Sequence, residues 1–342
     1  MPNVVFMDGF DVYDEELTNT NRPGLHSKWV VPRQESITFP AGRYGGRCIH
    51  FGEDIFGNVA QCFFNNNQYL QSATIAFAYL TNKVSDAEAH NQFLNLLHDQ
   101  EDQFGLMVSN IGQVRLYRGD TMVASTSPNL IKTNAWHFME LEYVGHASTG
   151  RTTLYVDGAK VVQFTGNTQN LAPYAFNGLQ FRGGTSSGYL IDDLYVTDTA
   201  ARFGERRIET LLPNGDVSGG QFTPSSGSTA FSMIDDNLVS ASDYVSATAL
   251  GSKSLFNLSN LSTNPDKIDA VQLNVWATKT DAATRQLQTI VKSGSVETNS
   301  PDYNLPTNHI CLNRIENADP STGLAWTATG VNALQAGFKI SQ

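Results

Sequence analysis

The sequence is poor in charged residues and has no cluster of positive charge. Charged residues make up 16% of the 342 residues, and 33 Asp and Glu against 22 Lys and Arg give a formal net charge of −11. Proteins that bind nucleic acid neutralise its phosphates with clustered Lys and Arg. No basic stripe is present, so we expect no nucleic-acid partner.

Long apolar runs and a leader segment are also missing. No run approaches the ~18 apolar residues that a membrane helix needs, so we expect no membrane insertion. The chain begins Met-Pro-Asn-Val-Val-Phe and leads into an acidic segment, without the positive and apolar regions of a secretory signal. We therefore expect the chain to fold in a cytoplasm.

Cysteine is scarce, with three residues at Cys48, Cys62 and Cys311. Their odd number and wide spacing do not form a disulfide framework. We expect buried free thiols, although Cys48 and Cys62 are also placed to meet across neighbouring strands.

Strand patterns dominate what is present, and the clearest covers residues 136–162. Its first strand alternates, which puts His137, Met139, Leu141 and Tyr143 on one face and Trp136, Phe138, Glu140 and Glu142 on the other. The later Asp157-Gly158 pair is typical of a two-residue hairpin turn. This stretch predicts a sheet built by local pairing.

The rest of the chain repeats short strand patterns separated by turn signals. About a dozen strands precede residue 200, and the helical pattern is weak even at residues 85–90, where at most one turn is expected. Residues 14–36 read as a long polar loop around Trp29. The length favours two domains, with the boundary near residues 197–202. We expect domains at 1–200 and 201–342.

The hairpin residues resemble a known family. The run Trp-His-x-x-x-Leu-x-Tyr from Trp136, followed by Leu-Tyr-Val-Asp-Gly from Leu154, is similar to the signature hairpin of laminin-G and concanavalin-like jelly rolls, and the strand 189–196 resembles their closing strand. The resemblance implies two antiparallel sheets packed face to face. The predicted fold is all-β, with two β-sandwich domains of which the first is a jelly roll.

The second half resembles another group. Glu-Arg-Arg-Ile-Glu-Thr-Leu-Leu-Pro-Asn-Gly-Asp from Glu205, and Trp-Thr-Ala-Thr-Gly-Val-Asn-Ala-Leu-Gln-Ala-Gly-Phe from Trp326, look like the carboxy-terminal part of virion structural proteins of tailed bacteriophages. The resemblance implies a tail, neck or fibre component or a capsid decoration, assembled in the host cytoplasm. Its partners would be copies of itself and other virion proteins.

Catalysis has little support in the sequence. Glu140 and Glu142 share a strand face, but the third acid of the Glu-x-Asp-x-Glu pattern of laminarinase-like sandwiches is missing, so we expect a solvated sheet face. No Gly-x-Ser-x-Gly elbow is present. We expect no enzyme, and no catalytic or cofactor-binding residues.

Two acidic residues on the closing strand are the candidates for a metal. Asp192 and Asp193 stand where related domains sometimes place a calcium ligand, and hard oxygen ligands suit calcium. The alternative is that one carboxylate accepts backbone hydrogen bonds while the other faces water. The seven histidines show no zinc spacing.

Four aromatic residues are the candidates for contact with a glycan or with another subunit: Trp29, Trp136, Tyr189 and Tyr195. Exposed rings stack on sugars, whereas aromatics in sandwiches usually belong to the core or to an interface. The sequence therefore leaves two functions open. One is a virion structural protein that works by assembly, and the other is a receptor-binding adhesin that recognises a host surface glycan.

Overall fold

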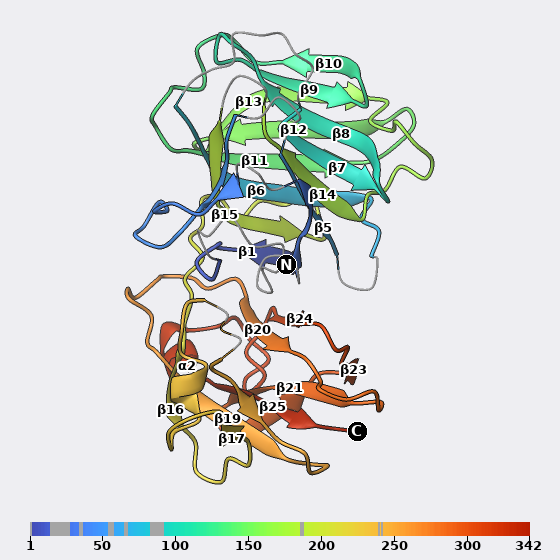
Figure 1. Cartoon of the computed structure of the whole chain (residues 1–342). Coiled ribbons are helices and arrows are strands. Elements are labelled where there is room, and N and C mark those ends of the chain that lie inside the picture. The colour runs from blue at the N-terminus through green and yellow to red at the C-terminus, as the bar shows by residue number, and fades with distance from the viewer. Residues whose placement is uncertain are drawn as a thin grey trace. The chain divides into compact units, whose positions relative to one another are not determined.

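The computed structural model describes residues 2–13, 28–33, 37–53, 58–64, 68–82, 92–184, 188–238, 240 and 242–342. Most of the predicted loop 14–36 and the predicted helical turn 85–90 lie outside these residues. The chain divides into two compact units, the first ending at Ile208 and the second running from Glu209 to Gln342. Nearly all regular structure is β-strand, which confirms the all-β prediction (Figure 1).

One sheet of the first unit has eight strands in the order β13-β12-β11-β6-β15-β4-β3, with β1 pairing with β15. Its strands are β1 (Val4–Asp8), β3 (Ile37–Thr38), β4 (Ile49–Phe51), β6 (Ser72–Thr81), β11 (His137–Val144), β12 (Gly150–Val156), β13 (Ala159–Gly166) and β15 (Tyr189–Thr197). The predicted hairpin is β12 and β13, joined by Asp157 and Gly158 with φ of 51° and 79°. Positive φ at both turn residues is what a two-residue hairpin needs.

The other sheet has seven strands in the order β10-β9-β8-β7-β14-β5-β2. Its strands are β2 (Val30–Arg33), β5 (Val59–Phe63), β7 (Leu94–His98), β8 (Glu101–Val108), β9 (Val114–Arg118), β10 (Thr121–Ser125) and β14 (Gly178–Arg182). Every pairing in both sheets is antiparallel, as the jelly-roll resemblance implies.

Aromatic contacts fix which side of each sheet faces the core. Phe77 of β6 packs edge-on against Phe181 of β14, with ring centroids 5.8 Å apart, and Phe104 of β8 lies 5.6 Å from Tyr143 of β11. All four side chains are fully buried, and burying each contributes roughly 1.5–3 kcal/mol. Because strand side chains alternate, the neighbours of these residues in sequence point outward.

The second unit combines a six-stranded sheet in the order β16-β19-β25-β21-β22, with β23 pairing with β21, and two strand pairs, β17-β18 and β20-β24. These elements are β16 (Pro213–Asp216), β17 (Thr223–Pro224), β18 (Val245–Ser246), β19 (Lys253–Leu258), β20 (Val271–Ala277), β21 (Gln286–Ser293), β22 (Val296–Asn299), β23 (Tyr303–Asn304), β24 (Ile310–Glu316) and β25 (Gln335–Ile340), with η2 (Phe231–Met233) and α2 (Ala328–Asn332). Leu312 of β24 packs with Phe256 and Phe338 of the larger sheet. This unit therefore also has two packed β-layers.

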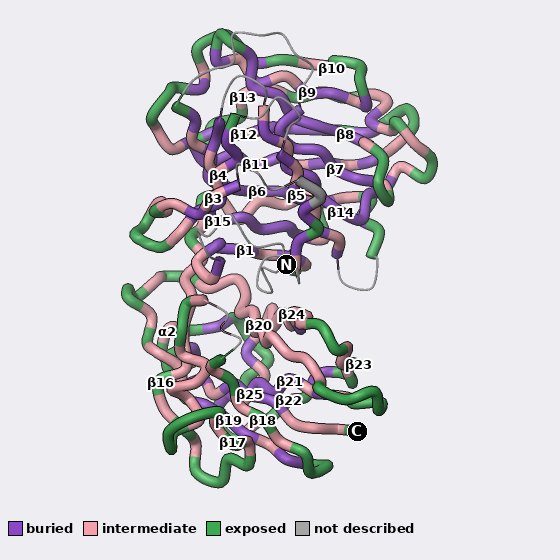
Figure 2. Tube along the Cα trace, viewed as in Figure 1, coloured by how far each residue is buried: buried purple, intermediate pink, exposed green. Residues whose placement is uncertain are grey.

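Burial differs along the chain, as Figure 2 shows: the strands of the first unit are mostly buried, and β20 and β24 are mostly intermediate. Cys48 and Cys62 are buried thiols, as predicted, and Cys311 is a half-buried thiol. Among the residues that the structure describes, no helix has the length and hydropathy of a membrane span.

Candidate functional site

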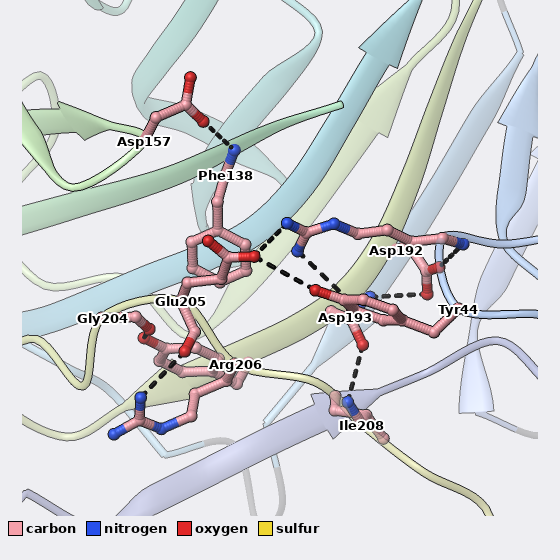
Figure 3. A network of polar contacts seen from close by, with 11 residues as sticks. Tyr44, Phe138, Asp157, Asp192, Asp193, Gly204, Glu205, Arg206 and Ile208 are labelled. Carbon is pink, nitrogen blue, oxygen red and sulfur yellow. Dashed lines mark hydrogen bonds and ion pairs between the residues drawn. The ribbon is translucent and has the colours of Figure 1, made fainter. Parts of the chain in front are cut away.

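A polar network lies on the outward face of the eight-stranded sheet, around the two predicted calcium ligands (Figure 3). The pairing of β15 with β6 shifts register between Asp192 and Tyr195, and Asp193 has a φ of 53°. Asp192 Oδ2 accepts a hydrogen bond from the backbone N–H of Arg43 at 2.8 Å. Asp193 Oδ1 accepts one from the backbone N–H of Ile208 at 2.7 Å.

Burial shapes the charge state of this aspartate pair. Asp192 and Asp193 are 5% and 2% exposed, and burial raises the pKa of Asp192 to about 6 and that of Asp193 to about 7. Both carboxylates thus accept backbone hydrogen bonds, and neither faces water. Among the described residues no group of three or more His, Cys, Asp or Glu is arranged to hold a metal ion. The calcium site stays a prediction.

Glu140 belongs to the same face, and the predicted solvated sheet face is wrong for it. Its side chain is 1% exposed, and burial raises its pKa. Its Oε1 accepts a hydrogen bond from the backbone N–H of Gly204 at 2.9 Å, and its Oε2 lies 3.4 Å from Nε of Arg202. The sequence pattern alone could not show that a later segment returns over this strand.

That later segment covers the face. Residues 202–208 are attached through Glu140 and Asp193, and Phe203 packs on a buried cluster made of Ala76, Ala78, Phe138 and Tyr195. The guanidinium of Arg202 lies over the ring of Tyr155, 3.7 Å from its centroid. The first unit therefore ends after Ile208, a few residues beyond the predicted boundary.

Three of the four candidate aromatics are not available to a sugar. Trp29, Tyr189 and Tyr195 are 1%, 3% and 3% exposed, which agrees with the alternative that aromatics of a sandwich belong to its core. The indole N–H of Trp29 donates to Asp8 Oδ2 at 2.8 Å, and the Tyr189 hydroxyl donates to the carbonyl of Arg182 at 2.9 Å. These rings belong to the core and its hydrogen bonds. Trp136 is half-buried against the cluster beneath Phe203.

The outward face of the seven-stranded sheet carries a different arrangement, which we call the carboxamide row. Directly paired residues of neighbouring strands place one position from each strand in line. In the order of the strands from β2 to β10 these are Val30, Gln61, Gln180, Asn95, Gly105, Tyr117 and Met122. The two ends are 52% exposed, whereas Gln180 and Asn95 in the centre are 4% and 0% exposed.

Gly105 makes room for two carboxamide side chains in the middle of the row. A Cβ at this position would overlap Oε1 of Gln92 and Oδ1 of Asn95, so two carboxamides converge where glycine has no side chain. Gln92 donates from Nε2 to the carbonyl of Gly119 at 2.7 Å. Gln92 Oε1 and both polar atoms of Asn95 have no hydrogen-bond partner in the structure. Buried carboxamides without partners are rare in folded proteins, because their desolvation is not compensated.

Charged and aromatic groups belong to the same strands as the row. Arg182 donates from Nη2 to Oε1 of Gln180 at 2.6 Å. Burial raises the pKa of Asp102, and the charge of Arg182 opposes that shift. The hydroxyl of Tyr117 lies 3.5 Å from Sδ of Met107. Amides, a guanidinium, a carboxyl and a phenol together suit a ligand rich in hydroxyl groups.

Sequence reasoning missed this row. Its members are spread over seven strands, and single polar residues between apolar ones read as an ordinary outward face. The available signals were Asn95 between Leu94 and Leu96, and Gln180 between Leu179 and Phe181. Only the pairing of distant strands brings them into line.

No protein-family model matches the chain, and no curated protein matches it. Solved structures do match. The receptor-binding domain of botulinum neurotoxin mosaic serotype C/D is 15% identical, with a TM-score of 0.37, over 57% of this chain and 49% of that chain. An alginate lyase from Chlorella virus is 12% identical, with a TM-score of 0.40, over 57% and 100%. The carbohydrate-binding module CBM66 from Bacillus subtilis is 12% identical, with a TM-score of 0.33, over 50% and 96%.

At such identities the likeness concerns the fold alone, and this chain spans about half of the matched toxin domain. The matches are β-sandwich domains whose names refer to receptor or carbohydrate binding or to lyases. They correct the expectation that the chain is no enzyme, because alginate lyases and a glucuronan lyase are among them. Nothing in these matches supports the virion role, which stays a prediction.

Proposed function

We propose that the first unit binds carbohydrate on the outward face of its seven-stranded sheet. The observation that carries this proposal is the carboxamide row, with the unpartnered side chain of Asn95 at its centre. A sugar hydroxyl both donates and accepts hydrogen bonds, and so does a carboxamide. Such a face is therefore complementary to a hydroxyl-rich ligand.

The opposite face supports the same choice of surface. On the eight-stranded sheet, residues 202–208 occupy the space over Phe138 and Glu140. A ligand would have to displace backbone hydrogen bonds to Glu140 and Asp193 before it reached that sheet. The carboxamide row is the alternative, and its two ends, Val30 and Met122, are 52% exposed.

The resemblance to virion proteins suggests that this binding takes place on a virus particle. In that setting the chain is a particle component whose first unit recognises a glycan on the host surface, which combines the two functions left open by the sequence. Tail, neck, fibre and capsid positions fit this proposal equally.

The experiment is a glycan array probed with the full chain, followed by calorimetric titration of each hit. We expect binding that weakens by at least about tenfold in Gln180→Ala, since one good hydrogen bond contributes roughly 1 kcal/mol and its unpaired partner costs more. Gln163→Ala, which removes an exposed carboxamide from β13, is the matched control and should bind normally. A folded chain that binds no glycan would overturn the proposal.

Analysis of the products after incubation with each bound glycan addresses catalysis separately. New reducing ends would show that the bound polysaccharide is also cleaved. Their absence would leave the binding proposal unchanged.

A further inference from the structure

We infer that the rim of the first unit, beside the turn between β7 and β8, is a second carbohydrate subsite. There a pyranose ring of a neutral sugar stacks on Tyr69 and donates a hydroxyl hydrogen bond to Asp99. The site uses none of the residues of the carboxamide row and shares with the proposed function only the class of ligand. The observation behind it is an exposed tyrosine ring whose orientation its neighbours fix.

Exposure singles out three tyrosines among the described residues. Tyr44 is 48% exposed, Tyr69 is 43% exposed and Tyr244 is 51% exposed. The guanidinium groups of Arg43 and Arg207 lie 5.0 Å and 5.2 Å from the ring centroid of Tyr44, so cations already surround that ring. Tyr69 and Tyr244 remain as exposed rings without a cation beside them, and they differ in how they are held.

Contacts with its neighbours hold Tyr69 in place although it is exposed. Its hydroxyl donates to Oδ1 of Asp99, and its ring centroid lies 5.2 Å from that of His98. The next residue, Leu70, exchanges backbone hydrogen bonds with Phe176 at 2.7 Å and 3.0 Å. A side chain that is already held in one orientation loses less entropy when a ligand binds to it. Tyr69 is therefore prepared for contact with a ligand.

Asp99 is positioned in a strained conformation. His98 pairs with Glu101, so Asp99 is the first residue of a two-residue turn, and its φ is 58°. Such a position favours glycine. Asn177 fixes the aspartate from both sides: its Oδ1 accepts from the N–H of Asp99 at 2.8 Å, and its Nδ2 donates to Oδ1 of Asp99 at 3.1 Å. Strained residues that their surroundings hold in this way cluster at ligand sites.

The second oxygen of Asp99 is the polar atom that a ligand meets. Tyr69 and Asn177 both donate to Oδ1, and within the described part of the chain Oδ2 makes no hydrogen bond. The hydrogen bond from Tyr69 lowers the pKa of Asp99, so this exposed carboxylate is ionised and only accepts. A pyranose has an apolar C–H face and hydroxyl donors at its edge. It therefore matches a tyrosine ring with a carboxylate at its edge.

A cation is the other kind of ligand that an aromatic ring beside a carboxylate attracts. Here Oδ1 of Asp99 already receives two hydrogen bonds, which compensate part of the charge. One further donor completes the group, and a sugar hydroxyl supplies it without the cost of desolvating a second charge. An anionic sugar is disfavoured, because Asp99 and Glu101 are both exposed acids of this turn. These charges favour a neutral sugar.

The test is calorimetric titration of the full chain with neutral oligosaccharides of glucose, mannose and galactose, in the natural background and in Gln180→Ala, which weakens the carboxamide row. Tyr69→Ala should lower the affinity by at least about tenfold, and Tyr69→Trp should stay within about threefold of the parent, because the aromatic face remains. Asp99→Asn, which tolerates the same φ, should lose at least about threefold, since a charged acceptor is replaced. Tyr244→Ala is the matched control and should bind normally. Thermal unfolding confirms that each variant is folded.

The other outcomes separate this inference from the proposed function. Sugar binding that falls in Gln180→Ala and not in Tyr69→Ala would overturn the rim subsite and leave the carboxamide row in place. Binding that falls in Tyr69→Ala and not in Gln180→Ala would support the rim and overturn the row. A loss in Tyr69→Ala that Tyr69→Trp does not restore would contradict stacking. Binding of an arginine-rich peptide instead of the sugars would assign the rim to a cationic partner, and a folded chain that binds no sugar would overturn both proposals.

Discussion

The two outward faces of the first unit bury polar side chains in different ways. On the eight-stranded sheet, Glu140 and Asp193 each have one oxygen bonded to a backbone N–H of residues 202–208, and the other oxygen lies 3.4 Å or 3.8 Å from an arginine. On the seven-stranded sheet, neither polar atom of Asn95 has a partner. The first face is covered by its own chain and keeps its buried carboxyl groups beside arginines, whereas the second buries a neutral carboxamide without a partner.

The buried polar side chains of the two faces also differ in charge, and this difference agrees with the contrast. A buried carboxylate is too costly to leave alone, so it occurs where the chain supplies N–H groups and guanidinium. Burying a neutral carboxamide without partners costs less free energy, and such a group can therefore remain unpaired until a ligand or a water binds it. Carboxylates on one face indicate a structural closure, and carboxamides on the other favour recognition.

Glu140→Ala should weaken the attachment of residues 202–208 to the eight-stranded sheet. We expect it to give the largest change in the free energy of unfolding. Removing the carboxylate leaves the N–H of Gly204 and the guanidinium of Arg202 without their buried partner, which should cost about 3 kcal/mol of unfolding free energy. Glu140→Gln keeps an acceptor for Gly204 and should cost roughly 1 kcal/mol or less. Calorimetric unfolding of the full chain measures both, and an unchanged transition in Glu140→Ala would contradict the closure.

The pH dependence of stability should sharpen the contrast, because the covered face holds a pair of acids with strongly raised pKa values, Asp192 and Asp193. Asp193 ionises near pH 4 when unfolded, and burial raises its pKa to about 7 in the folded unit. Between these values the folded state binds more protons, so the contribution of Asp193 to stability is complete below about pH 4 and is lost as the pH rises through about 7.

The measurement is the thermal midpoint at about pH 5 and about pH 8. The natural chain should lose more stability on this rise than Asp193→Asn, which keeps an oxygen for the N–H of Ile208 but cannot ionise. Other carboxyl groups titrate in both proteins, so the difference between them isolates Asp193. Equal pH profiles would mean that the pKa of Asp193 is not raised in the folded unit.

Much of the first unit could be predicted from local sequence. The Asp157-Gly158 pair specified the turn between β12 and β13, because both residues accept positive φ. Alternation along β11 placed Tyr143 and Phe138 on opposite faces of the strand, and the structure confirms this. Such patterns depend on neighbours within a few residues.

The state of the outward faces could not be predicted in this way. Glu140 is buried because Gly204, 64 residues later, returns to it. Asn95 meets Gly105 on one side and Gln180 on the other, so its surroundings depend on pairing between three strands. Trp29 has a polar neighbourhood in sequence but a partner in Asp8. Burial of this kind depends on tertiary contacts that no local pattern contains.

Asn95→Leu should change the free energy of unfolding in the opposite direction to the substitutions on the covered face. A leucine of similar size removes two unpartnered polar atoms from a buried site, so we expect the unfolding free energy to rise by about 1 kcal/mol. The corresponding change Asp193→Leu should lower it, because the N–H of Ile208 loses its acceptor. Calorimetry on both variants tests the pair. A loss of stability in Asn95→Leu would show that the carboxamide already has a partner within the folded chain.

Glu205→Ala should have the smallest effect, and it tests what closes the covered face. Glu205 pairs with Arg43, but its side chain is 52% exposed. An exposed ion pair of this kind contributes roughly 0–1 kcal/mol, because water screens the charges and both side chains lose freedom. Loss of Glu205 should therefore change the unfolding free energy by less than about 1 kcal/mol. If it matched Glu140→Ala, the surface ion pair rather than the buried hydrogen bonds to backbone N–H groups would hold residues 202–208 on the sheet.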